Sequence, residues 1–394
     1  MSLEFLFAIS DTGGGHRSAA VAIGAALDHA TGGTASHTIV DVLRASGVPG
    51  VRDAPSLYDI LSTRWLRFYD FSFNLTNSAW RVDMITRLVW LRARRSITYE
   101  LRNAQPQVVV VTHPLVNRLV CIARRAYRLP FRVITVVTDL VTLHASWTYR
   151  GVDLALAPTD EAYALMTSRG MRTERLLRTG FPVHPKFAEA ANDQHSMRQR
   201  LGLAQDRFTV LVTGGGVGSG QLGALVRTLA AQLPQHQVLV VTGKNRALYD
   251  ELKAHCRSPY FHIYGFVNNM EELMVASDVV ITKAGPGTLM EALVMRRPVL
   301  VTEAVGMQER GNIDFVLNRD IGRFCPTADR IIDAVTELSN PQVYAATQSR
   351  LADAVPRNGS AQIAQILLDQ LAIAKQQLYG EGRNEGRGRR RRRG

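Results

Sequence analysis

The segment DTGGGHRSAA, at residues 11–20, carries the strongest chemical signature in the chain. Its three glycines let the backbone turn sharply and approach a ligand closely, and the helix that follows would offer free N–H groups to an anion or a polar group. At this turn stands His16, whose imidazole is suited to act as a general base at neutral pH. The alternative is that His16 only caps the helix. We favour catalysis, because a glycine run beside a lone histidine has little packing purpose.

The glycine spacing of this first motif is not GxGxxG, so it does not predict a nicotinamide cofactor. A second glycine-rich segment, LVTGGGVGSG at residues 211–220, repeats the plan of strand, glycines and helix. Its glycines, Gly215 and Gly216 among them, can present backbone amides to a phosphate. The segment lacks GxxxxGK[ST] and is therefore not a Walker loop. Its place after the first strand of a domain favours phosphate binding.

A third segment, ITKAGPGTLMEAL at residues 281–293, places a Gly-Pro-Gly turn between a strand and a helix. We expect the helix to begin near Thr288, so that its N-terminus and the Thr288 hydroxyl can hold a phosphate. Glu291 is expected in the first helical turn. There its carboxylate either stabilises the helix dipole or accepts two hydrogen bonds from a ribose diol. Local chemistry does not separate these two roles.

A fourth segment, GMQERGN at residues 306–312, follows another predicted strand. Gln308, Glu309 and Asn312 form a polar cluster that can bind sugar hydroxyls. The alternative is an ordinary solvated loop.

The stretch from Tyr58 to Arg95 mixes aromatic and basic residues. It holds eight Phe, Tyr and Trp residues and seven arginines against three aspartates. Aromatic and basic side chains interleaved in this way suit a membrane interface, where rings and guanidinium groups sit at the boundary of lipid and water. The alternative is a helical excursion whose aromatics pack in the core. We favour the interface because arginine is in excess.

Short β-rich runs alternate with helical stretches along the whole chain, which predicts a doubly wound α/β architecture. Near-continuous apolar runs fit strands that are covered on both faces. Helices are expected between them, for example at residues 18–29, 222–232 and 287–295. The expected strands lie at residues 3–10, 108–112, 132–137, 154–157, 209–213, 237–241, 261–264, 279–282 and 298–301.

The length of 394 residues allows two or three domains. Two prolines in GFPVHPKF, at residues 180–187, interrupt regular structure and mark a boundary. We therefore expect an N-terminal domain at residues 1–185, a C-terminal domain at 186–370, and a basic tail without regular structure at 371–394.

The net charge of +13 suits anionic partners such as lipid headgroups, nucleotide phosphates or nucleic acid. The tail carries seven arginines and is either an electrostatic tether or a solvated end. The three cysteines are widely spaced and indicate small buried residues in a reducing compartment rather than disulfides or a zinc site. We find no signal peptide and no apolar run of spanning length.

Taken in order, DTGGGHR, GFPVHPKF, VTGGG, KAGPGTLMEAL and QERGN resemble the monogalactosyldiacylglycerol synthases and the related bacterial diacylglycerol glucosyltransferases. More distantly the plan resembles MurG, the glycosyltransferase of lipid II synthesis. The resemblance runs from about Phe5 to about Pro356. It implies a GT-B fold, with two Rossmann-like domains facing a central cleft. It also implies an inverting hexosyl transfer from UDP-galactose or UDP-glucose to diacylglycerol, without a metal or other cofactor.

The resemblance also implies roles for single residues. His16 would be the general base on the diacylglycerol hydroxyl. Gly215 and Gly216 would lie near the diphosphate, and Phe266 and Val267 would flank the uracil. In the donor site Gly287 and Thr288 would meet phosphate, Glu291 the ribose, and Gln308 and Glu309 the hexose. The acceptor and membrane side would comprise Gly14, Gly15, Trp65, Arg67, Trp80, Arg81 and His113.

On this interpretation the protein lies peripherally on the cytoplasmic face of a membrane, with anionic lipids as partners and no specific nucleic acid. Two departures concern the donor sugar: GGGVGSG lacks the acidic residue that many plant-type relatives carry after GGG, and QERGN replaces the usual QEAGN. Two rival hypotheses remain. One is a UDP-sugar transferase or epimerase with another acceptor, and the other is a basic, non-enzymatic nucleic-acid-binding protein.

Overall fold

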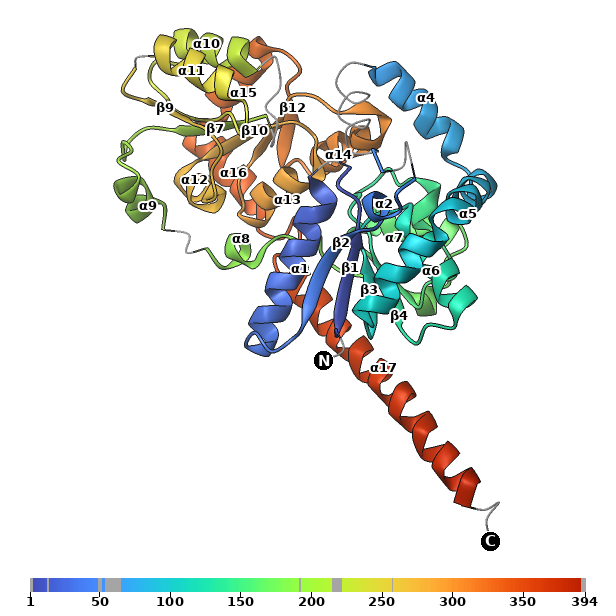
Figure 1. Cartoon of the computed structure of the whole chain (residues 1–394). Helices are drawn as coiled ribbons and strands as arrows, with labels where there is room; N and C mark the ends of the chain where they lie inside the picture. Colours follow the sequence, from blue (N-terminus) through green and yellow to red (C-terminus); the bar gives the residue numbers. More distant parts are fainter. Residues whose placement is uncertain are drawn as a thin grey trace. The chain divides into compact units, whose positions relative to one another are not determined.

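The chain forms two compact units in the computed structural model, which describes residues 3–12, 14–48, 52–53, 65–190, 193–214, 222–256 and 258–390. Unit 1 comprises Met1–Asp139, Leu143–Pro182 and Asn358–Gly394, and unit 2 comprises Leu140–Thr142 and Val183–Arg357. Each unit is built on its own sheet (Figure 1).

The sheet of unit 1 has six parallel strands in the order β2-β1-β3-β4-β5-β6. The switch point of this order lies at β1, whose partners are β2 on one side and β3 on the other. In chain order the strands are β1 (Phe5–Ile9), β2 (His37–Asp41), β3 (Val108–Val111), β4 (Arg132–Val136), β5 (Leu154–Ala157) and β6 (Leu176–Arg178).

Alternation of side chains along β1 explains the two helix layers of unit 1. Phe5, Phe7 and Ile9 face one cluster, which takes in α1 (Gly15–Thr31) and α17 (Gly359–Arg390). Leu6 and Ala8 face the other cluster, which takes in α2 (Val42–Ala45), α5 (Ala79–Ala104), α6 (Val116–Tyr127) and α7 (Asp160–Ser168). Strands covered on both faces are fully apolar, and β1 and β3 are buried along their whole length.

Unit 2 repeats this plan with six parallel strands in the order β12-β11-β10-β7-β8-β9. The strands are β7 (Thr209–Thr213), β8 (Gln237–Val241), β9 (Phe261–Tyr264), β10 (Val279–Thr282), β11 (Val299–Val301) and β12 (Gly322–Phe324). Around them lie α8 (Pro185–Glu189), α9 (Gln194–Arg200), α10 (Leu222–Gln232), α11 (Arg246–His255), α12 (Met270–Ala276), α13 (Pro286–Val294), α14 (Gly306–Asn318), α15 (Ala328–Leu338) and α16 (Pro341–Leu351).

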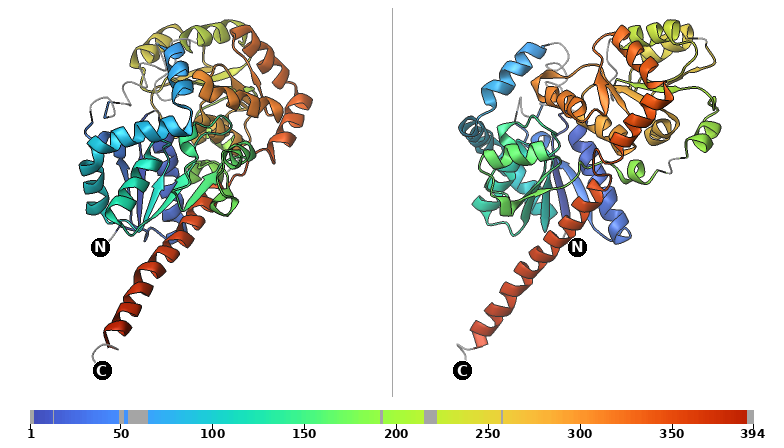
Figure 2. Two further views of the ribbon diagram at one scale, coloured as in Figure 1. Left: turned by 90° about the vertical axis from the view of Figure 1, so that its right-hand side faces the viewer. Right: turned by 180° about the vertical axis from the view of Figure 1, so that it is seen from behind.

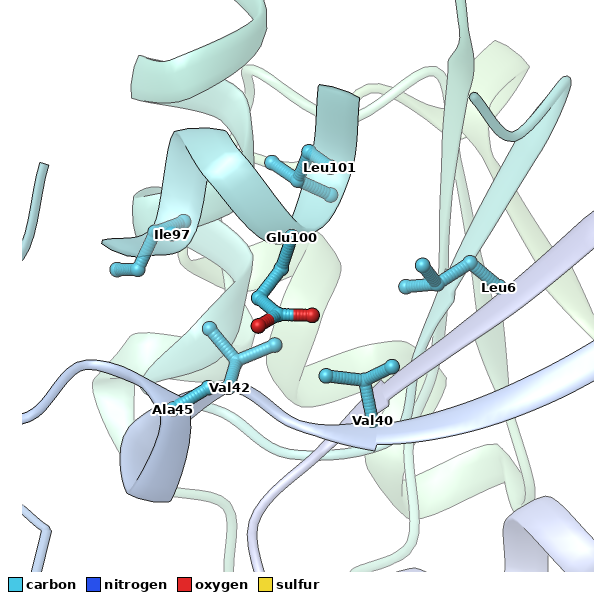
Figure 3. Close-up of a pocket in the computed structure, with 7 residues that line it drawn as sticks. All are labelled: Leu6, Val40, Val42, Ala45, Ile97, Glu100 and Leu101. Carbon is cyan, nitrogen blue, oxygen red and sulfur yellow. The ribbon is translucent and has the colours of Figure 1, made fainter. Parts of the chain in front are cut away.

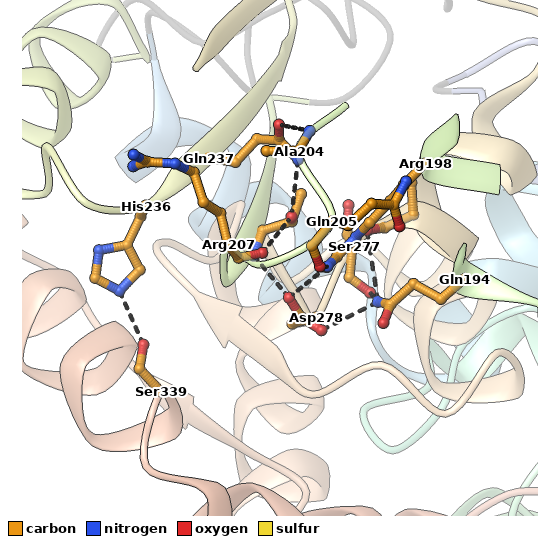
Figure 4. Close-up of polar contacts among 12 residues, drawn as sticks. Gln194, Arg198, Ala204, Gln205, Arg207, His236, Gln237, Ser277, Asp278 and Ser339 are labelled. Carbon is orange, nitrogen blue, oxygen red and sulfur yellow. Dashed lines mark hydrogen bonds and ion pairs between the residues drawn. The ribbon is translucent and has the colours of Figure 1, made fainter. Parts of the chain in front are cut away.

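A buried carboxylate ties α9 to the start of two strands of unit 2 (Figure 4). One oxygen of Asp278 accepts hydrogen bonds from the guanidinium of Arg198 at 2.7 Å and from the backbone N–H of Thr209 at 2.6 Å. The other oxygen accepts one from Gln194 at 3.0 Å. Because both oxygens are satisfied, the charge of Asp278 is compensated inside the unit.

The C-terminal segment corrects two expectations. Residues 358–370 belong to unit 1 and not to the second domain, because Ile363, Ala364, Leu367 and Leu371 of α17 pack in the core around β1 and α1. The residues from 371 to Arg390 continue α17 and are not irregular; residues 391–394 lie outside the described part (Figure 2). The boundary itself falls between Pro182 and Val183, three residues before the expected position.

Among the described residues, no helix combines the length and the apolar character needed to cross a membrane. Cys121 and Cys325 are buried, Cys256 is half-buried, and all three are free thiols.

Candidate functional site

The turn that carries His16 connects the carboxyl end of β1 with α1. Gly14 is the N-cap of α1 and Gly15 its first residue. A side chain at either glycine would meet no atom within 4 Å, so the space in front of the turn is open to a ligand. Asp11 accepts two hydrogen bonds from Arg17, at 2.6 and 2.8 Å, and this ion pair braces the loop. The expected strand–glycine–helix arrangement is confirmed, except at Gly13, which lies outside the described residues.

Hydrogen bonds determine which nitrogen of His16 carries the proton. Its Nδ1 lies 2.7 Å from the carbonyl oxygen of Thr112 and 3.0 Å from the hydroxyl of Thr138. A carbonyl oxygen can only accept, so Nδ1 donates and Nε2 keeps its lone pair. Burial lowers the pKa of His16 to about 4, although the bond to the Thr112 carbonyl acts in the opposite direction. The side chain is therefore a neutral imidazole at pH 7, with Nε2 able to accept a proton.

Two buried histidines, His113 and His144, lie in the same region as the half-buried His16. The ring of His113 lies 4.6 Å from that of His16, edge to face, and its Nε2 is 2.8 Å from the Thr12 hydroxyl. Burial, with the nearby His16 and His144, holds the pKa of His113 well below its usual value. His144 bonds Ser146 Oγ through Nδ1 at 2.6 Å and Thr76 Oγ1 through Nε2 at 3.1 Å. Thr76 ends α4 (Leu66–Thr76), so the cluster connects this helix to the site.

Sequence reasoning missed Thr112, Thr138 and His144, although a signal was present. Thr112 and His113 directly follow β3, and Thr138 follows β4 after one intervening residue. The strands β1, β3 and β4 are neighbours in a parallel sheet, so their carboxyl ends meet at one edge. Polar residues directly after adjacent apolar strands are therefore expected to converge.

The aromatic–basic stretch forms α4 and the first half of α5, and it is largely exposed. Trp65 is 63% and Trp80 64% exposed, and Arg67 is also exposed. Arg81 donates to the carbonyl oxygen of Leu75 at 2.8 Å, with its guanidinium 5.3 Å from the Trp80 ring centre. The alternative in which these aromatics fill the core is therefore wrong for Trp65 and Trp80, while Trp90 packs partly buried against the core. It holds for Phe73, which is buried against His144. Residues 58–64 lie outside the described part.

In unit 2 the third motif forms the turn between β10 and α13. The helix begins at Pro286, so Glu291 lies in its second turn. The expectation that Glu291 lies in the first turn is therefore wrong. At that depth a dipole effect is small, since it falls off within the first turn. Burial raises the pKa of Glu291 to about 7, against the opposing effect of Lys186. The space over Gly287 is open, with no atom within 4 Å of an added side chain, and Thr288 follows it in the first turn.

The fourth motif is helical, because Gly306 begins α14 and brings Gln308 and Glu309 into its first turn. Glu309 accepts a hydrogen bond from the Val305 N–H at 2.8 Å. Its other carboxylate oxygen faces Gly285 and would lie 3.6 Å from a Cβ atom added there. Asn312 donates to the Ala284 carbonyl at 2.8 Å. The interpretation as a solvated loop is wrong, because these side chains hold the turns after β10 and β11 together.

Of the remaining donor residues, Phe266 and Val267 follow β9 closely, and Phe266 is exposed. Gly215 and Gly216 lie outside the described residues. Both turns, after β9 and after β10, stand at the carboxyl edge of the same parallel sheet. Within the described part of the chain, no group of three or more His, Cys, Asp or Glu side chains is arranged to hold a metal ion.

A sequence model described as monogalactosyldiacylglycerol (MGDG) synthase matches residues 16–183, and one described as the glycosyltransferase family 28 C-terminal domain matches residues 209–304. The chain is 29% identical over 350 residues to the chloroplastic monogalactosyldiacylglycerol synthase of Spinacia oleracea, covering 86% of this chain and 66% of that protein. It is 30% identical over 329 residues to monogalactosyldiacylglycerol synthase 2 of Arabidopsis thaliana, covering 81% and 70%. The chain thus spans slightly less than two thirds of the spinach protein.

Solved structures share the fold of this chain. MurG of Acinetobacter baumannii has a TM-score of 0.61 at 13% identity, with 93% of this chain and 100% of that chain covered. The UDP-GlcNAc 2-epimerase of Neisseria meningitidis has a TM-score of 0.59 at 16% identity, with 94% and 100% covered. At these identities the likeness establishes the fold alone, which is GT-B.

Proposed function

The chain belongs to the monogalactosyldiacylglycerol synthase family, and from that premise we propose that it transfers a hexose from a UDP-sugar to diacylglycerol with inversion. Galactose and glucose are the two candidate hexoses. The observation that carries the proposal is the neutral imidazole of His16, whose Nδ1 is held by Thr112 so that Nε2 can take a proton. It stands at an open glycine turn, where a ligand can approach.

In the proposed step the acceptor hydroxyl oxygen attacks the anomeric carbon from the face opposite the diphosphate. The bond between this carbon and the diphosphate breaks, and UDP leaves with the electron pair. The hydroxyl proton passes to Nε2 of His16. A base placed in this way contributes about a hundredfold to ten-thousandfold in rate.

The negative charge that develops on UDP needs stabilisation, which α13 would supply. Its N-terminus presents the N–H groups of Gly287 and Thr288, which have no acceptor within the helix, and the helix dipole favours an anion there. We assign the diphosphate also to Gly215 and Gly216, and we expect no metal ion or other cofactor.

The rest of the donor would be bound by the carboxyl edge of the second sheet. Glu291 would accept hydrogen bonds from the ribose hydroxyls, Phe266 and Val267 would flank the uracil, and Gln308 and Glu309 would contact the hexose. The raised pKa of Glu291 supports a ligand role, since a half-buried carboxylate gains from hydroxyl donors that replace lost water.

Diacylglycerol resides in a bilayer, so the enzyme must work at a membrane surface. The exposed rings of Trp65 and Trp80, with Arg67 and Arg81 beside them, suit peripheral binding to anionic lipids. We assign the acceptor to the region of Gly14, Gly15 and His113. We propose that this surface is the cytoplasmic face of a membrane.

The test is incubation of the purified chain with phosphatidylcholine vesicles that contain diacylglycerol, in separate reactions with UDP-galactose, UDP-glucose and UDP-N-acetylglucosamine. Lipid products are identified by mass spectrometry, and the anomeric configuration by NMR. We expect a β-linked hexosyl-diacylglycerol from one of the first two donors, unaffected by EDTA. Conversion of a UDP-sugar without lipid would identify an epimerase instead, and RNA binding without turnover of any donor would support the non-enzymatic alternative.

A further inference from the structure

The short helix α8 is anchored to unit 2 at several points and carries Lys186. The side chain of His184 caps this helix by accepting a hydrogen bond from the Lys186 N–H at 3.2 Å. Phe187 is buried, and the guanidinium of Arg357 donates to the Ala188 carbonyl oxygen at 2.7 Å. The backbone that bears Lys186 is therefore held in place. The proposed reaction gives this lysine no role.

The ammonium group of Lys186 makes two contacts at the start of α12. Its Nζ donates a hydrogen bond to the Asn268 carbonyl oxygen at 2.7 Å and lies 2.7 Å from a carboxylate oxygen of Glu271. The side chain of the lysine is 35% exposed and that of Glu271 is 19% exposed, so salt screens this pair less than a pair on the open surface. A free lysine side chain has many rotamers, and two partners at once hold it in one conformation.

Asn268 belongs to the turn between β9 and α12, which also carries Phe266 and Val267. Within the described part of the chain, no backbone–backbone hydrogen bond holds residues 265–268. The bond from Lys186 therefore fixes a carbonyl oxygen that secondary structure does not engage. In the proposed function Phe266 and Val267 flank the uracil. A turn that is already held in one conformation receives a base without the cost of ordering the chain on binding.

The same lysine acts on the carboxyl group of Glu291. Helix α8 packs against α13, which carries Glu291. Burial is the largest effect and raises the pKa of Glu291 to about 7, while Lys186 lowers this pKa and Glu271 raises it. Lys186 thus favours the ionised form of the carboxylate that the proposed function places on the ribose. Further ionisable side chains on the elements that pack against or adjoin α13 are His184, Glu189, Lys283, Glu303 and Glu309.

A carboxylate beside a small gap is not by itself a ligand site. In unit 1 the side chain of Glu100 points toward Val40 and Val42, at a gap of about 10 Å³ that holds about one water molecule (Figure 3). Glu291 differs because it lies four residues after Gly287 on the same helix face, and helical side chains lean toward the N-terminus. The space over Gly287 is open. The carboxylate that Lys186 influences is therefore directed toward a space that a ligand can enter.

We propose that Lys186 positions the nucleotide part of the donor: through Asn268 it holds the turn that flanks the base, and its positive charge stabilises the Glu291 carboxylate that accepts the ribose hydroxyls. The inference rests on the proposed function for the identity of the ligand, a uridine nucleotide. It adds a positioning residue that acts through its neighbours.

The first test measures the affinity of the full chain for UDP by isothermal titration calorimetry at pH 8, without lipid. Lys186→Met keeps the aliphatic part of the side chain and removes the ammonium group, so that UDP has to order the turn when it binds. We expect the affinity to be about tenfold weaker, the effect of losing one hydrogen bond to a charged group. Lys186→Arg keeps the charge and the N–H donors and should restore most of the affinity.

A matched lysine separates this effect from general attraction between charges, because UDP is an anion. Lys253→Met in α11 removes the same charge from an exposed position of unit 2 and should bind UDP like the wild type. The inference would be overturned by a Lys186→Met protein that binds UDP like the wild type, by a loss that Lys186→Arg does not restore, or by an equal loss in Lys253→Met.

The pH dependence of UDP affinity gives a signature that damage to the fold does not produce. Ionised Glu291 accepts hydrogen bonds on both oxygens, so the affinity should fall as the pH decreases through about 7. Lys186→Met removes the charge that lowers the pKa of Glu291, so the fall should begin at a higher pH. Glu271→Gln removes the charge that raises this pKa, so the fall should begin at a lower pH.

The titration of UDP itself is common to all of these proteins and cancels in the comparison. Glu271→Gln also keeps the test decisive where Lys186→Met folds poorly. Shifts in the same direction for both variants, or a Lys186→Met shift that persists in the Glu291→Gln background, would overturn the action of Lys186 on Glu291.

Kinetics with diacylglycerol vesicles separate positioning from loss of active protein. Lys186→Met should raise KM for the sugar nucleotide about tenfold and leave kcat within about twofold, whereas partial unfolding lowers kcat at an unchanged KM. A chain whose UDP affinity depends on Lys186 but which transfers no hexose would keep this inference and remove the proposed function. Transfer with a UDP affinity independent of Lys186 would do the reverse, and a wild-type chain that binds no UDP would overturn both.

Discussion

At the scale of single residues, three imidazoles share one buried region of unit 1 and are held uncharged by it. His16 and His144 have pKa values of about 4, and that of His113 is also well below its usual value. Desolvation is the largest cause in each case. The low pKa makes His16 a weaker base but keeps it unprotonated near neutral pH, and a general base must be unprotonated before it can accept a proton.

Replacement of His16 by alanine should leave the fold intact and reduce hexosyl transfer by about a hundredfold to ten-thousandfold. The Nε2 atom is the proton acceptor in the proposed step, while the His16 side chain is only half-buried, so its removal leaves no closed cavity in the core. Initial rates with diacylglycerol vesicles, together with the melting temperature, measure both effects. Near-wild-type turnover would exclude His16 as the base.

The same histidines predict how stability depends on pH. Their folded pKa values lie below the ordinary value of 6.5, so the unfolded chain binds more protons between pH 6.5 and about 4. The unfolding free energy should therefore be insensitive to these groups above pH 6.5. It should fall below that pH by about 1.4 kcal/mol per pH unit for each histidine. Urea titrations across this range should show a smaller slope for His144→Gln, and an unchanged slope would contradict the assignment.

The carboxylate of Asp278 should matter for the stability of unit 2. Asp278→Ala would leave the buried guanidinium of Arg198 without its partner, which costs about 3–5 kcal/mol. The double variant Asp278→Ala/Arg198→Met should recover part of the loss, since no unpaired charge remains. Denaturant unfolding of both variants measures the difference. Equal losses would mean that the network contributes through packing and not through charge.

At the scale of elements, the buried strands were predicted from the sequence, whereas partly exposed edge strands were missed. All nine strands that were expected are present, eight of them within one residue of their bounds and the first shortened to Phe5–Ile9. The three strands that were missed, β2, β6 and β12, all lie at sheet edges and are partly exposed. An edge strand needs no continuous apolar run, so a sequence such as His37–Asp41 carries little strand signal.

The candidate site could be predicted as far as its glycine turns and His16, because a turn has a local sequence signature. Its further parts, Thr112, Thr138 and His144, are assembled from separate strands, and only the strand order brings them together. Glu291 was assigned to the wrong helical turn because the helix starts at Pro286, where proline is well tolerated in the first position.

Removal of α17 tests how much one element contributes to unit 1. A chain ending at Arg357 loses Ile363, Leu367 and Leu371, and burial of each side chain contributes about 2 kcal/mol to the free energy of unfolding. Together these contributions approach the whole unfolding free energy of a typical domain. We expect this chain to be insoluble or unfolded in unit 1. A chain ending at Leu378 keeps the buried residues and should melt like the full protein. Equal behaviour of the two chains, judged by yield and thermal unfolding, would contradict the packing of α17.

At the scale of the whole molecule, charge is spread unevenly. The segment after Leu378 carries seven arginines and two glutamates, or +5 of the total +13. Nonspecific binding to a polyanion rises with the number of charges and falls steeply with salt. The chain ending at Leu378 should therefore bind RNA more weakly and with a smaller salt slope, while hexosyl transfer to neutral vesicles is retained. Loss of transfer in that chain, measured beside filter binding of RNA, would assign the arginines a role beyond electrostatics.

The return of the chain to its first unit has a consequence for biogenesis. Unit 2 is nearly continuous, from Val183 to Arg357, and can acquire its core as soon as that stretch has left the ribosome. Unit 1 begins earlier yet completes its core later, because the residues of α17 that pack against β1 and α1 are translated only after unit 2. During that interval one face of its sheet is covered by α1 but not by α17, so the half that is made first is the half that most needs protection by chaperones.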